Sequence, residues 1–141
     1  FIQKLWKLNV EILNKQDSTS NEQDGVLEKA VNKTVYNVTK NLDNFQYNVV
    51  IANIHEIYNL LYAHVINNKT SNKTLKNEWE KITMLLMPII PHLAHECCKK
   101  TNKEFYWPKY DPKLLKEESC TIVIQVDGIK NFTGPSMILN C

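Results

Sequence analysis

Apolar side chains recur at helical spacing in four stretches of the chain, and polar loops separate these stretches. Intervals of three and four residues place side chains on one face of an α-helix. They predict four helices, near residues 1–14, 26–42, 45–66 and 75–100. The side chains expected to be buried between them include Trp6, Val35, Ile54, Leu61, Trp79, Leu86 and Ile89. The pattern therefore predicts an antiparallel helical bundle.

Two prolines, Pro88 and Pro91, fall inside the fourth predicted helix. Proline has no backbone N–H to donate, and its ring clashes with the preceding helical turn. We therefore expect a kink or an interruption at this place.

The character of the sequence changes after residue 104. An aromatic, proline-bearing linker is expected over residues 105–118. The β-branched run 121–126, closed by Asp127 and Gly128, is typical of a strand followed by a hairpin turn. The predicted fold class is thus all-α: an antiparallel helical bundle over residues 1–104, followed by a short C-terminal β-strand or hairpin. Because one strand leaves its backbone edges unpaired, residues 119–141 are expected to begin a truncated α+β domain.

Composition narrows the class of protein. The 141 residues are 43% hydrophobic and carry 17 basic against 15 acidic side chains, a net charge of +2, which argues against a disordered chain. No apolar run approaches the ~20 residues of a membrane-spanning helix, so no membrane partner is expected. All 17 basic residues are lysines. Any contact with nucleic acid would therefore use point charges and not the bidentate fork of arginine.

Residues 92–98 hold the most suggestive cluster of reactive side chains. On a helix, His92, His95 and Glu96 fall within reach of one another, and Cys98 lies near His95, so a zinc site is one interpretation. The spacing matches no established zinc signature. The alternative is one buried, hydrogen-bonded histidine, with the cysteines acting as small hydrophobic residues. We expect no metal at His92, His95, Cys97 or Cys98, and we expect His92 to be buried.

The second predicted helix carries a stripe of basic and polar side chains opposite its apolar stripe. Its members Lys29, Lys33, Asn37 and Lys40 are the candidate contacts to the phosphates of a nucleic acid. The alternative is an ordinary solvated helix face. The three glycines are isolated, so the sequence has no glycine-rich phosphate loop, and no nucleophile arrangement has supporting context. No catalytic residue is therefore expected.

Five segments carry motifs whose order along the chain is informative. They are FIQKLWKL at 1–8, KT and VT at 33–34 and 38–39, FQYNVVIA at 45–52, LMPIIPHLA at 86–94, and WP at 107–108 followed by TIVIQVDG at 121–128. In this order they resemble the leucyl-tRNA synthetases of bacterial or organellar type, over residues 1 to about 128. The last segment favours the leucine enzymes over those for valine or isoleucine. Several positions depart from the family pattern: Asn32 stands where histidine is usual, His95 replaces a glutamate, Cys98 replaces a tryptophan, and Asp127 replaces the asparagine before Gly128. Residues 129–131 also do not reproduce the basic stretch that usually follows.

The resemblance implies a division of labour. In that family a catalytic domain with HIGH and KMSKS motifs joins leucine to tRNA(Leu) with ATP and Mg²⁺, and neither motif occurs in this sequence. The chain would be the non-catalytic, anticodon-binding helical segment, without a cofactor of its own, and would support the tRNA body. Its implied partners are tRNA(Leu) and the rest of the synthetase, with no DNA and no membrane, in the cytoplasm or an organelle matrix.

Two alternatives stay open. One is the corresponding bundle of a valyl-, isoleucyl- or methionyl-tRNA synthetase. The other is a non-catalytic helical interaction module without an RNA partner.

Overall fold

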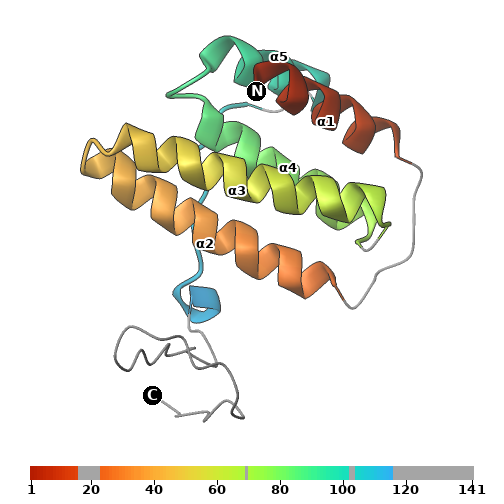
Figure 1. Ribbon diagram of the computed structural model, residues 1–141, viewed down its shortest axis with the longest axis horizontal. Helices are drawn as coiled ribbons and strands as arrows, with labels where there is room; N and C mark the ends of the chain where they lie inside the picture. The colour runs from red at the N-terminus through yellow and green to blue at the C-terminus, as the bar shows by residue number, and fades with distance from the viewer. Residues whose placement is uncertain (16–22, 69, 102–103, 116–141) are drawn as a thin grey trace, which may run out of the picture.

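Helices make up most of the described part of the chain, which in this computed structural model is residues 1–15, 23–68, 70–101 and 104–115. Within these residues five α-helices precede a short 3₁₀ helix (Figure 1): α1 (Ile2–Asn14), α2 (Asp24–Asp43), α3 (Tyr47–Ile66), α4 (Asn72–Leu86), α5 (Pro91–Thr101) and η1 (Pro112–Leu115). The predicted all-α bundle is confirmed. The strand at 121–126, its turn and the domain start at 119–141 lie outside the described residues.

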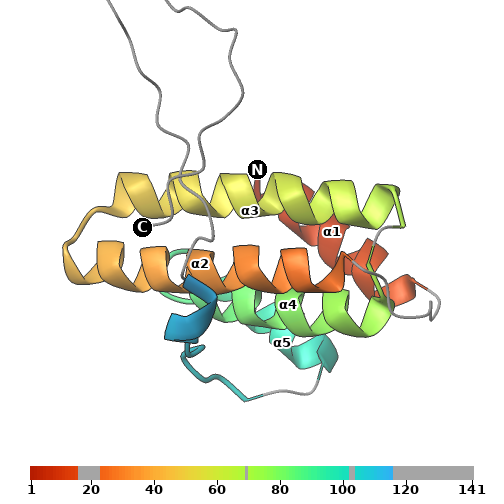
Figure 2. The ribbon, with the colours of Figure 1, turned by 90° about the horizontal axis from the view of Figure 1, so that it is seen from below.

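The helices pack around one shared core. α2 and α3 run side by side in opposite directions, and α4 packs against both (Figure 2). α1 packs on α3, α4 and α5, and within the described ranges it makes no packing contact with α2. α1 and the outer side of α2 therefore belong to different surfaces of the bundle.

The prolines divide the fourth predicted helix in two. α4 ends at Leu86, a turn follows in which the Ile90 N–H donates to the Leu86 carbonyl at 2.8 Å, and α5 begins at Pro91. Proline suits the first helical position, because the N–H that it lacks would have no partner inside the helix. α4 also begins earlier than expected, because the Ser71 hydroxyl accepts the Thr74 N–H and caps the helix.

Most of the expected core side chains are buried. Val35, Ile54, Leu61, Trp79 and Leu86 are each at most 2% exposed, as their spacing predicted. Ile89 is only partly buried, against the edge of the core. The prediction for Trp6 is wrong, because this ring is half-buried at the surface, where the Lys100 ammonium lies 4.4 Å from its centroid.

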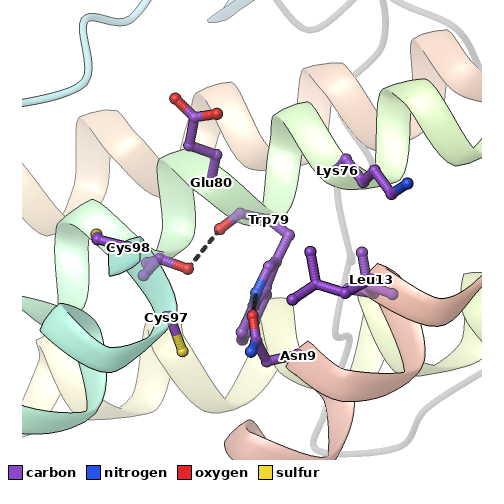
Figure 3. Close-up of a pocket in the computed structure, with 9 residues that line it drawn as sticks. Asn9, Leu13, Lys76, Trp79, Glu80, Cys97 and Cys98 are labelled. Carbon is purple, nitrogen blue, oxygen red and sulfur yellow. Dashed lines mark hydrogen bonds between the residues drawn. The ribbon is translucent and has the colours of Figure 1, made fainter. Parts of the chain in front are cut away.

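A buried polar contact joins α1 to α4 inside this core. The Trp79 Nε1–H donates to Asn9 Oδ1 at 2.8 Å (Figure 3), and Asn9 is fully buried. Beside them lies a cavity of about 60 Å³, which Cys97 and Cys98 also line. Asn9 Nδ2 has no hydrogen-bond partner among the described residues. This amide is thus a costly group to bury, and its one bond to Trp79 fixes how α1 sits on α4.

α3 is long enough and apolar enough to span a membrane by length and composition. The absence of a long uninterrupted apolar run in the sequence had predicted no such helix. Its most apolar 18 residues have a mean hydropathy of 1.2, and a third of that window is buried inside the bundle. The core helices of helical bundles meet the same two criteria, so one such helix is weak evidence for a membrane-spanning segment. Its inward stripe of Val50, Ile54, Ile57 and Leu61 packs in the core.

Glu78 on α4 is a buried carboxylate that we expect to make stability depend on pH. Its Oε1 accepts from Lys81 Nζ at 2.6 Å, while Oε2 has no hydrogen-bond partner in the described part of the chain. Burial raises the pKa of Glu78 above its ordinary 4.5, and the bond from Lys81 opposes that rise only in part. From 4.5 up to the raised pKa, the folded state holds more protons than the unfolded chain. The contribution to stability therefore falls as pH rises through this window.

Glu78→Gln should remove this pH dependence. We expect the free energy of unfolding at pH 7 to rise by on the order of 1 kcal/mol, because no charge is then buried, and its decline above pH 4.5 to flatten. Urea unfolding across pH 4–8 measures both effects. Glu96→Gln is the control, since Glu96 pairs with Lys99 on the exposed surface. An unchanged pH profile for Glu78→Gln would contradict the assignment.

Candidate nucleic-acid interface

The outward side of α2 presents three lysines, called here the lysine face (Lys29, Lys33 and Lys40). The helix buries its apolar stripe of Leu27, Val31, Val35 and Val38. The three lysines lie on the opposite side, and each is exposed. Because a helix rises 1.5 Å per residue, they extend over about 16 Å along the axis. This length suits contact with more than one phosphate of a nucleic-acid backbone.

Asn37, the fourth candidate, takes a different position. It is half-buried, at the edge of the lysine face and not in its centre. The structure therefore brings the three lysines together on one open surface. It leaves Asn37 less accessible to a large partner.

The linker segment (residues 104–115) crosses α2 and is fixed to it by two hydrogen bonds from one side chain. Asn32 Nδ2 donates to the Asp111 carbonyl at 2.9 Å, and the Asp111 N–H donates to Asn32 Oδ1 at 2.7 Å. η1 follows directly and lies against α2 (Figures 1 and 2). The segment that was expected to be a linker is thus held against the bundle.

Aromatic side chains add to this attachment. The Trp107 Nε1–H donates to Thr39 Oγ1 at 3.1 Å. The rings of Tyr36 and Tyr110 meet edge to face with centroids 5.2 Å apart, and the Lys40 ammonium lies 6.0 Å from the Tyr36 centroid. The lysine face and the linker segment therefore form one continuous surface on α2.

Sequence reasoning missed the residues that hold the linker segment. Asn32, Tyr36 and Thr39 follow one another at intervals of four and three, on the flank of α2 beside the lysine face. That spacing, together with the aromatic run 105–110, is the signal that could have indicated a docked linker. Nothing local in the sequence shows that Asn32 and Asp111 meet.

We expect Asn32→Ala to loosen the linker segment. Two hydrogen bonds are lost, each worth about 0.5–1.5 kcal/mol, so the Asp111 amide should exchange with deuterium roughly 5- to 160-fold faster. Amide exchange read by NMR or mass spectrometry measures this change. Asn37→Ala on the same helix is the matched control and should leave the Asp111 amide protected. Equal exchange rates in Asn32→Ala and the unmutated chain would contradict the role of this side chain.

The histidines and cysteines of α5 do not converge. His92 and His95 are exposed, so the prediction of a buried His92 is wrong, whereas Cys97 and Cys98 are buried. The break at Pro91 places His92 in the first turn of a new helix whose inward side is taken by Ala94 and Cys97. Within the described residues, no three histidine, cysteine or acidic side chains lie close enough to share a metal ion.

The two thiols are also poor nucleophiles and poor metal ligands. Burial raises the pKa of Cys97 to about 11 and also raises that of Cys98. The thiolate is the form that attacks or binds metal. Figure 3 shows the two side chains pointing in different directions, with the Cys97 sulfur toward Asn9 and Trp79. Both cysteines act as packing residues at the cavity between α1, α4 and α5.

Most of the chain matches a known class of domain. A family model described as the anticodon-binding domain of tRNA ligase matches residues 24–131. The chain belongs to this family of anticodon-binding domains.

The curated relatives of this chain are leucine–tRNA ligases. The leucine–tRNA ligase of Fervidobacterium nodosum is 34% identical over an alignment 142 positions long. This alignment covers 91% of this chain and 17% of the relative. The leucine–tRNA ligase of Prochlorococcus marinus (strain MIT 9215) is also 34% identical, and the match covers 91% of this chain and 16% of the relative. The leucine–tRNA ligase of Cereibacter sphaeroides is 30% identical, and the match covers 90% of this chain and 15% of the relative. The chain thus spans about one sixth of the length of these relatives.

A solved structure shares the fold. It is the ternary complex of the Agrobacterium radiobacter K84 agnB2 leucyl-tRNA synthetase with tRNA and LeuAMS. The TM-score is 0.69 at 21% identity, over 84% of this chain and 17% of that one. At this identity the likeness establishes the architecture of the bundle.

Proposed function

We propose that this chain is the anticodon-binding helical segment of a leucine–tRNA ligase and that it holds the body of tRNA(Leu) through the lysine face of α2. The lysine face is the observation that carries the proposal, since it is an open cationic surface on a domain of this family. Two findings support the proposal. The relatives are leucine–tRNA ligases, and the solved complex that shares the fold contains tRNA.

The proposed contact is electrostatic. Lysine ammoniums would pair with backbone phosphates and release counterions, which gives affinity without reading bases. Because arginine is absent from the sequence, no planar fork is available to grip a phosphate or a guanine edge. The chain would therefore position tRNA by its shape and charge.

The chemistry of leucine activation would take place elsewhere in the full-length ligase. We propose that ATP and Mg²⁺ are used by a catalytic domain outside this sequence, in the cytoplasm or an organelle matrix. This chain would then bind RNA but would not attach leucine to it.

Binding of fluorescently labelled tRNA(Leu), followed by anisotropy, tests the proposal. We expect weak binding at physiological salt, and we expect it to weaken further when Lys29, Lys33 and Lys40 are changed together to Ala. Unchanged affinity in this variant would overturn the assignment of the lysine face. Leucylation of tRNA by the chain alone would overturn the division of labour.

A further inference from the structure

An open groove lies between α2 and the linker segment. It has a volume of about 350 Å³ and is lined by Thr39, Trp107, Pro108, Lys109, Tyr110 and Pro112. The volume falls within the range of pockets that hold small ligands, which begins at about 300 Å³. Trp107 and Tyr110 supply flat aromatic surfaces, the two prolines add apolar ones, and Lys109 is the one cation in the lining.

The rings of the groove are held in place by contacts outside it. Trp107 is tied to Thr39 through its indole N–H, and Tyr110 is braced by the edge-to-face contact with Tyr36. Asn32 fixes the backbone at Asp111, one residue beyond Tyr110. A ligand would therefore meet aromatic surfaces whose positions are already set, which reduces the entropy lost on binding.

The charge around the groove favours an anion. Lys109 is part of the lining and is exposed, and Lys113 is exposed in the adjoining η1. Lys40 lies over the Tyr36 ring, which in turn contacts Tyr110. The nearest acid in the segment is Asp111, whose Oδ1 accepts the Lys113 N–H. One lysine therefore lines the groove, and the adjoining helices α2 and η1 carry two more, Lys40 and Lys113.

We propose that this groove binds one unpaired nucleotide of RNA, with its base stacked on the aromatic lining and its phosphate beside Lys109 and Lys40. The proposal rests on the RNA-binding role proposed above and adds a preference for unpaired RNA to it. A base inside a duplex has both faces covered by its neighbours, whereas a loop nucleotide can stack on a protein ring. The lysine face alone would bind paired and unpaired RNA by charge.

The test compares two RNA probes on the full chain. One is a hairpin with an unpaired loop, and the other is a blunt duplex of the same length and charge. We expect the hairpin to bind at least 5-fold more tightly, which is the lower end of what one stacked base contributes. Tyr110→Leu should reduce this preference to near unity, Tyr110→Phe should retain it, and Lys109→Ala should weaken hairpin binding. The matched control is Tyr62→Leu on α3, because Tyr62 and Tyr110 are 38% and 39% exposed.

Tryptophan fluorescence gives a second readout in the same samples. A base stacked in the groove should quench Trp107, while Trp79 is buried in the core and should stay bright. Trp6→Phe removes the signal of the third tryptophan, which is on α1.

The outcomes separate the two proposals. Equal binding of hairpin and duplex, or a hairpin preference that Tyr110→Leu leaves intact, would overturn the groove but leave the lysine face standing. Lys29→Ala with Lys33→Ala tests the lysine face without touching Lys40, which borders the groove. Unchanged affinity for both RNAs in this double variant, with the hairpin preference intact, would support the groove and count against the lysine face. Absence of binding to either RNA would overturn both.

Discussion

Replacing Trp79 with Ala is expected to lower the free energy of unfolding by about 3–5 kcal/mol, the usual cost of removing a large buried aromatic side chain. Trp79 is 2% exposed in the middle of α4, where it packs in the shared core and bonds Asn9 of α1. The change therefore opens a cavity and also strands the fully buried Asn9 amide. Urea unfolding followed by circular dichroism measures the loss.

Two further variants separate packing from hydrogen bonding. Trp79→Phe keeps an aromatic ring in the core but cannot donate to Asn9, so we expect an intermediate loss. Tyr47→Ala is the surface control, because Tyr47 is 53% exposed and its loss should change stability by less than about 0.5 kcal/mol. A loss below 1 kcal/mol for Trp79→Ala would show that this ring does not anchor α1 to α4.

The affinity of the chain for tRNA(Leu) should fall steeply with salt. Each phosphate contact contributes about −0.9 to the slope of log K against log salt for B-DNA and about −0.7 for single strands. If each lysine of the lysine face contacts one phosphate, the slope contribution is about −2 to −3 by the same rule. Raising salt from about 50 to 200 mM should then weaken binding roughly 20- to 60-fold through these contacts alone. Changing all three lysines to Ala should remove this contribution of about −2 to −3 from the slope of log K against log salt.

A charge-matched control is available on the other side of the bundle. Lys4 and Lys7 on α1 are exposed, and so is Lys76 on α4, which lines the cavity beside Asn9 of α1. Changing these three lysines to Ala alters the net charge of the chain by the same three units. Because α1 does not pack against α2 within the described residues, this variant should keep most of the slope. Equal effects of the two triple variants would indicate non-specific attraction in place of a defined surface.

The sequence by itself determined the bundle and the lysine face. Helical periodicity is a local property, because side chains three and four residues apart share a face whatever the helix packs against. The inward stripe of α2 and the outward position of Lys29, Lys33 and Lys40 follow from spacing alone and are confirmed. The break near Pro88 and Pro91 was foreseeable for the same reason, since the clash of a proline is with its own preceding turn.

Only the tertiary structure decided the contacts between distant segments. Asn32 meets Asp111 across 79 residues of chain, and Trp107 meets Thr39 across 68, so no local pattern indicates either pair. The exposure of His92 and the half-burial of Trp6 likewise depend on how α5 turns after its proline and where it lies against α1. Spacing along a helix says which side chains share a face, but the direction of that face in the fold is fixed by the helices packed around it.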